Sequence, residues 1–125
     1  MTSGIPPLVS AVVSGDTLTL TFVQGTPAFE LTPQATARFT ATDGRGGTVV
    51  LSGTAGVLIV LHGFRGDMQN YAGTKDLMAN GKILVEVREL GEFEGVVGWA
   101  AGLGRAGCAN VAVGSSTLTF TFLAS

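Results

Sequence analysis

The side chains that perform nucleophilic and metal-dependent catalysis are scarce in this sequence. It contains one histidine, His62, and one cysteine, Cys108. A catalytic thiol or hydroxyl needs a base beside it, so nucleophilic chemistry would require His62 to lie next to its nucleophile. A zinc site needs three or four Cys, His or carboxylate ligands. We therefore expect neither a metal nor a cofactor, and the sequence identifies no catalytic residue.

Two further patterns resemble familiar sites but have simpler explanations. Glu86 and Arg88 alternate along one predicted strand, which favours a surface ion pair of little energetic weight. The glycines at 102, 104 and 107 are spaced like part of a dinucleotide-binding loop, yet no helical pattern follows them. A glycine-rich turn accounts for them better, so nucleotide chemistry is not expected.

Aromatic and thioether side chains are the better candidates for a site. Trp99 lies between Gly98 and Ala100, whose small size leaves room around the indole. An apolar ligand would be lined by the following substrate-binding candidates, with His62 as hydrogen-bond donor: His62, Phe64, Met68, Tyr71, Met78 and Trp99. The alternatives are core packing for Trp99 and a contact with the backbone for His62.

Composition narrows the class of partner. Of the 125 residues, 46% are hydrophobic and 13% are charged, and the net charge is −2. The basic residues are scattered, which disfavours nucleic acid. The longest apolar run, residues 56–61, is too short to span a membrane. The surplus apolar surface would serve a core, a ligand cavity or a subunit interface, and the oligomeric state stays open.

The first residues lack the basic start and apolar stretch of a signal peptide. This favours a cytoplasmic location, or an extracytoplasmic one where a signal peptide precedes Met1.

Period-two alternation predicts an all-β fold. It is clearest in residues 17–22 and 117–122, where leucines and phenylalanines alternate with threonines. We expect Leu18, Leu20, Phe22, Leu118, Phe120 and Phe122 to face inward. Further strands are expected at residues 8–13, 29–31, 37–41, 48–51, 57–61, 82–90, 96–101 and 109–113. About eight to ten short strands predict an antiparallel β-sandwich or a flattened barrel.

One connection is much longer than the others. Residues 62–81 form a stretch with no strand pattern, whereas most connections in compact domains have a few residues. Long loops of this kind are often lids or binding loops. We expect this segment to close over an apolar cavity that Trp99 reaches.

The second half of the chain carries the motifs of a known family. They are the loop Asn70-Tyr71-Ala72-Gly73, the strand at 87–90, and the block 91–103, in which Phe-Glu-Gly-Val-Val precedes Trp99. On these motifs the chain, from Gly15 onward, resembles the AMIN-like domain of actinobacterial secreted proteins and lipoproteins. The resemblance implies one AMIN-like β-sandwich domain over residues 1–125 and a non-catalytic, lipoprotein-type module that binds a component of the cell envelope.

A second resemblance rests on architecture and apolarity. A small stand-alone β-sandwich is similar to the cyclases recruited into polyether and tetronate antibiotic biosynthesis, which perform cofactor-free cycloaddition in an apolar cavity. Such chemistry needs a polyketide substrate folded into its reactive conformation and one hydrogen bond to polarise it. The leading prediction is therefore a pericyclic cyclase of Diels–Alder or hetero-Diels–Alder type acting on a hydrophobic small molecule. The alternative is the envelope-binding module.

Overall fold

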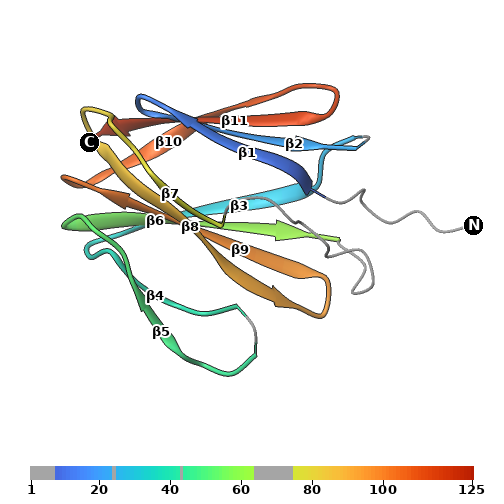
Figure 1. Cartoon of the computed structure of the whole chain (residues 1–125), viewed down its shortest axis with the longest axis horizontal. Helices are drawn as coiled ribbons and strands as arrows, with labels where there is room; N and C mark the ends of the chain where they lie inside the picture. Colours follow the sequence, from blue (N-terminus) through green and yellow to red (C-terminus); the bar gives the residue numbers. More distant parts are fainter. Residues whose placement is uncertain (1–7, 24, 43, 64–74) are drawn as a thin grey trace, which may run out of the picture.

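The computed structural model describes residues 8–23, 25–42, 44–63 and 75–125, and these form strands joined by turns (Figure 1). In chain order the strands are β1 (Leu8–Ser14), β2 (Thr17–Phe22), β3 (Ala28–Gln34), β4 (Arg38–Thr40), β5 (Thr48–Val50), β6 (Ala55–His62), β7 (Asp76–Met78), β8 (Leu84–Phe93), β9 (Val96–Leu103), β10 (Gly107–Val113) and β11 (Thr117–Ala124). The all-β prediction is confirmed.

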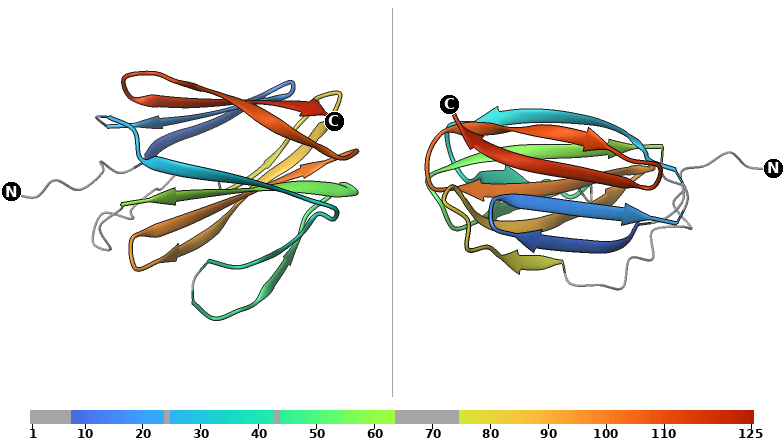
Figure 2. Two further views of the ribbon diagram at one scale, coloured as in Figure 1. Left: turned by 180° about the vertical axis from the view of Figure 1, so that it is seen from behind. Right: turned by 90° about the horizontal axis from the view of Figure 1, so that it is seen from above.

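Three antiparallel sheets lie in layers (Figures 1 and 2). The order β1-β2-β11-β10 makes a four-stranded sheet, and β3-β6-β9-β8-β7 makes a five-stranded sheet that packs against it. The short hairpin β4-β5 lies on the far side of the five-stranded sheet. Within the described residues the strands form a sandwich and do not close into a barrel.

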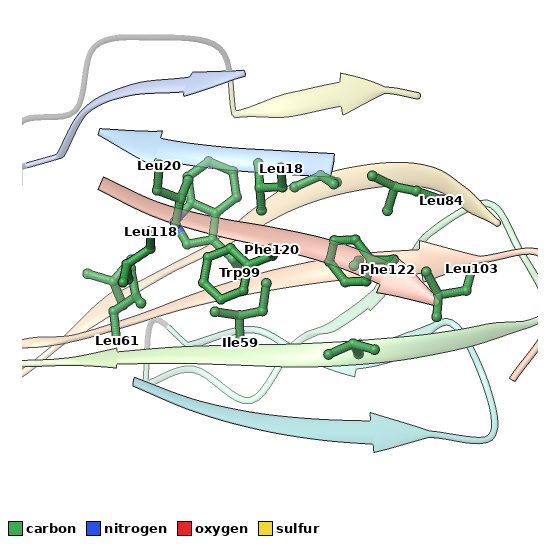
Figure 3. Close-up of a cluster of buried hydrophobic side chains, with 14 of the residues drawn as sticks. Leu18, Leu20, Ile59, Leu61, Leu84, Trp99, Leu103, Leu118, Phe120 and Phe122 are labelled. Atoms are coloured by element: carbon green, nitrogen blue, oxygen red, sulfur yellow. The ribbon is translucent and has the colours of Figure 1, made fainter. Parts of the chain in front are cut away.

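Alternation positions the core between the two larger sheets (Figure 3). The six leucines and phenylalanines expected to face inward from β2 and β11 are at most 2% exposed, which confirms the register. Opposite them, β6 and β9 contribute Val57, Ile59, Leu61, Trp99 and Leu103, all fully buried. The ring of Phe29 on β3 meets Phe120 edge-on, with centroids 6.1 Å apart. The core is therefore filled by side chains from both sheets.

A second, smaller core lies under the β4-β5 hairpin. Phe39 and Leu51 pack there against Leu90 and Ala100 on the outer face of the five-stranded sheet. The hairpin approaches so closely that a Cβ added to Gly102 would overlap the carbonyl oxygen of Ser52. This close approach explains why glycine and alanine occupy the outward-facing positions 98, 100 and 102 of β9.

The predicted loop at 62–81 is shorter than expected at both ends. His62 is the last residue of β6, and β7 occupies 76–78, where Leu77 pairs with Val87 of β8. A three-residue strand is too short for alternation to reveal it, and only its pairing with β8 defines it. Residues 64–74 lie outside the described part of the chain.

Candidate functional site

Trp99 lies in the core and not on an open surface. Its side chain is 0% exposed and sits among Leu18, Ile59 and Phe120 (Figure 3). The core-packing alternative for Trp99 is therefore what the structure shows.

The other candidate lining residues do not converge on Trp99. His62 ends β6 with its side chain 40% exposed, and its Nε2 lies 3.3 Å from Oε2 of Glu30 on β3. Met78 is 67% exposed on β7, at the opposite edge of the same sheet. Phe64, Met68 and Tyr71 fall outside the described residues. The structure therefore does not bring His62, Met78 and Trp99 together.

The four-stranded sheet has a feature that the sequence pattern did not reveal. None of the residues of β1, β2, β10 and β11 is Asp, Glu, Lys or Arg, although the chain has seven basic and nine acidic residues. The inner side of this sheet is core, so charge is not expected there. Its solvent-facing side, which we call the neutral face, lacks charge as well, and this is unusual because exposed strand faces normally carry charged residues.

Threonines occupy the centre of the neutral face. The β2–β11 register places three pairs directly opposite one another: Thr21 and Thr117, Thr19 and Thr119, and Thr17 and Thr121. Ser10, Val12 and Ser14 of β1 flank them on one side, and Asn110 and Ala112 of β10 on the other. Directly opposite residues on paired strands have side chains about 5 Å apart, so their hydroxyls and methyls form a regular array. Val12, 54% exposed, and Leu123, 49% exposed, add apolar surface.

Most of the charged residues with perturbed pKa values lie on the other sheet. Nη2 of Arg88 donates to Glu86 at 2.9 Å and to Asp76 at 3.0 Å, and Glu86 also accepts the Ser52 N–H at 2.8 Å. A hydrogen bond with Glu86, together with burial, raises the pKa of Asp76. Burial alone would raise the pKa of Glu86, but hydrogen bonds from Asp76, Ser52 and Arg88 hold it below its ordinary value.

The expected ion pair between Glu86 and Arg88 is present, but its placement at the surface is wrong. Glu86 is only 3% exposed, because the end of the β4-β5 hairpin covers it and its carboxylate satisfies the Ser52 N–H. The group joins the outer hairpin to the five-stranded sheet, which is a structural role.

Glu89 is a candidate functional residue that sequence reasoning missed. It lies directly opposite Trp99 in the β8–β9 register, its side chain is 12% exposed, and burial raises its pKa although the Lys75 ammonium lies 4.0 Å away. A carboxyl group held near an indole in a poorly solvated position favours the protonated form. Alternation alone marked Glu89 as a strand residue, so no sequence signal distinguished it.

Shallow clefts lie near the C-terminus. The largest of three, about 340 Å³, opens between β3 and β10 and is lined by Pro33, Gln34, Ala35, Ala106, Gly107, Cys108 and Ser125. The other two, about 270 and 160 Å³, also border the last residues of β11. None of these three clefts is lined by Trp99, His62 or Met78, so they are not the predicted cavity.

The described residues contain neither a metal-binding group nor a membrane-spanning helix. No three His, Cys, Asp or Glu side chains there are grouped so as to hold a metal ion. Helices of a length and apolarity that would cross a membrane are also missing from this part of the chain.

Comparison with known proteins does not identify the chain. No protein-family model matches it, and no match was found among curated proteins or solved structures. The resemblances to AMIN-like domains and to small cyclases therefore stay predictions.

Proposed function

We propose that this protein is a non-catalytic binding module and that the neutral face is its binding surface. The observation that supports this is the complete lack of charge on the solvent side of a sheet whose centre is six paired threonines. A surface of this kind loses little hydration energy when it is covered, because no ion has to be desolvated. It therefore suits a flat partner that is itself uncharged.

The partner class that fits best is a neutral glycan of the cell envelope. Sugar rings offer hydroxyl and acetamido groups to the threonine hydroxyls, which both donate and accept hydrogen bonds. The threonine methyls, with Val12 and Ala112, offer apolar contact to the C–H faces of the rings. An envelope component is also what the resemblance to AMIN-like domains implies.

A sedimentation assay with insoluble chitin, an uncharged polymer of N-acetylglucosamine, tests this proposal. The double variant Thr19→Val and Thr119→Val removes the central hydroxyl pair and keeps the shape. We expect it to bind at least about tenfold more weakly, since two hydrogen bonds of about 1 kcal/mol each are lost. The matched control is Thr32→Val on the exposed outer side of β3, which should bind as the wild type does. Failure of the wild type to sediment with the glycan would show that the proposal is wrong.

A second candidate function is the cofactor-free cyclase. Glu89 supports it, because burial raises the pKa of its carboxyl group, which lies opposite Trp99 in the β8–β9 register and could donate a hydrogen bond to a dienophile when protonated. A linear polyketide carrying a diene and a dienophile would be incubated with the wild type and with Glu89→Gln, and the cyclised product quantified. We expect the wild type to accelerate cyclisation and the variant to accelerate it less. No acceleration over the uncatalysed reaction by the wild type would exclude this function.

A further inference from the structure

Exposed edge strands carry unpaired backbone groups, and proteins usually protect them against pairing with another chain. In the five-stranded sheet, edge strand β3 carries Glu30 and Pro33, and edge strand β7 has three residues, one of them Asp76. In the four-stranded sheet, edge strand β1 has an irregular register between Leu8 and Ser10. Charge, proline, short length and bulges are the usual protective devices, so these three edges are protected.

The fourth edge, β10, has none of these devices. Its sequence, Gly-Cys-Ala-Asn-Val-Ala-Val, contains neither charge nor proline. It pairs with β11 over its full seven residues with no shift in register. Its final residue, Val113, is 59% exposed. A regular, neutral and partly apolar edge of this length is open to pairing with a further strand.

The hydrogen bonds at the two ends of β10 show which backbone groups point outward. Gly114 donates to Thr117 at 2.8 Å, and Ser125 donates to Ala106 at 3.0 Å. In an antiparallel ladder every second residue bonds the same neighbour, so Cys108, Asn110 and Ala112 bond β11. The N–H and C=O groups of Ala109, Val111 and Val113 then point away from β11. No hydrogen bond within the described part of the chain satisfies them.

We propose that β10 pairs antiparallel with β10 of a second copy of this chain. A two-fold axis at Val111 lets the two Val111 residues exchange both backbone hydrogen bonds, while Ala109 pairs with Val113 of the partner subunit. The residues that meet are small or β-branched and uncharged, so neither repulsion nor bulk opposes the approach. Pairing also covers the exposed side chain of Val113.

Pairing with a second copy is favoured over pairing with a different strand because it joins the two neutral faces. Joining two four-stranded sheets at β10 makes one continuous sheet, and the two neutral faces become a single surface. Asn110 and Ala112 then lie at its centre and not at its margin. The net charge of −2 is carried by residues outside these strands, so the joined surface stays uncharged.

Sedimentation equilibrium over a range of concentrations tests the pairing. We expect the wild type to reach twice the chain mass of 12.7 kDa. Val111→Pro removes an outward N–H that β11 does not use, and Val113→Lys places a charge on the edge, so each should weaken dimerisation at least about tenfold. The matched control is Val12→Lys, which is similarly exposed, at 54%, but lies on the neutral face away from β10. It should dimerise as the wild type does. Circular dichroism establishes that each variant is folded.

Residue-resolved hydrogen exchange gives an independent readout. The amides of Ala109, Val111 and Val113 should exchange quickly at low protein concentration and slowly at high concentration. Those of Asn110 and Ala112 should be protected throughout. A monomeric wild type at all concentrations, or a dimer that survives both edge variants, would overturn the pairing. Protection of the three outward amides only by an added extended peptide would also overturn it.

The two proposals fail separately. If the protein is a dimer that does not bind glycan, the proposal of β10 pairing stands and the proposal of glycan binding fails. If it is a monomer that binds glycan, the reverse holds. Val12→Lys should weaken glycan binding without affecting dimerisation, whereas Val113→Lys should affect dimerisation first.

Discussion

At the scale of single residues, Asp16 joins the two sheets at one end of the sandwich. It lies in the turn between β1 and β2, and its Oδ1 accepts the N–H of Ile83 at 2.8 Å and of Leu84 at 3.0 Å. Its backbone carbonyl accepts the N–H of Phe122 at 2.9 Å. One turn residue of the four-stranded sheet thus satisfies the amide of the first residue of β8 and the amide that precedes it.

The Asp16 carboxylate should make stability depend on pH. The N–H groups of Leu84 and Ile83 lower its pKa against the opposing effect of burial. Because the pKa is lower in the folded state, its stabilisation is present above the unfolded value of about 3.9 and is lost as pH falls through the folded value. Asp16→Asn should therefore cost about 1 to 2 kcal/mol of unfolding free energy at neutral pH and progressively less below about pH 4.

Urea unfolding of the wild type and Asp16→Asn at several pH values measures this difference. Glu94→Gln, which removes one carboxylate from the β8–β9 turn, is the control for the change in net charge. A constant difference between wild type and Asp16→Asn across the acidic range would contradict the explanation.

Glu86 and Glu89 show how position along one strand decides the role of a carboxyl group. Glu86 faces the β4-β5 hairpin and is held by Ser52 and Arg88, so it is ionised and structural. Glu89 lies on the opposite side of β8, across from Trp99 in the register, and burial raises the pKa of its carboxyl group. The pKa of a glutamate is therefore lowered at one position of this strand and raised at another, depending on whether hydrogen-bond donors offset the burial of the carboxyl group.

At the scale of elements, the outer hairpin β4-β5 is held by close contact with β9. The carbonyl of Ser52 and the side chain of Leu51 lie against Gly102, where there is no room for a Cβ. Leu51 also donates its N–H to Ala37 at 2.9 Å, which closes the hairpin. The packing of this third layer thus depends on a residue without a side chain.

Gly102→Ala should displace the hairpin and destabilise the fold by about 1 to 3 kcal/mol, as overpacking usually does. Gly104→Ala is a matched control, because the nearest atom to its added Cβ lies 3.8 Å away. Thermal unfolding should show a lower midpoint for the first variant and little change for the second. Equal midpoints for the two would mean that the hairpin is not tightly packed.

At the scale of the whole molecule, charge is segregated between the two sheets. The five-stranded sheet carries the ion pairs at Asp76, Glu86 and Arg88, whereas the four-stranded sheet carries none. Charged residues keep a surface soluble and disfavour association, so the sheet without them is the surface better suited to association. The proposed glycan surface and the proposed β10 pairing both belong to this sheet.

Glycan binding through the neutral face should not depend on ionic strength. Salt screens interactions between charges, and the strands of the neutral face contain no charged residue. The fraction that sediments with chitin should therefore stay constant between low and high salt. A steep loss of binding with salt would mean that charged residues of the other surfaces carry it.

The strands and their inward faces could be predicted from the sequence because alternation is local. In residues 17–22 and 117–122, leucine or phenylalanine alternates with threonine. Only one register of such a strand buries all of its apolar side chains. Strand β7 could not be predicted, since three residues carry no measurable period and only β8 defines them. The burial of Glu86 was missed because the group that covers it, at Ser52, is far away in the sequence.

The all-β class and the inward faces could be predicted from residue type and spacing, since both depend on one segment at a time. The fold was needed to show that the uncharged strands β1, β2, β10 and β11 form one sheet, that their threonines oppose one another in pairs, and that β10 lies unprotected at its edge. It also placed Trp99 in the core and Glu89 beside it. The physical reason is that strand order and register join residues distant along the chain, and no local pattern specifies which strands become neighbours.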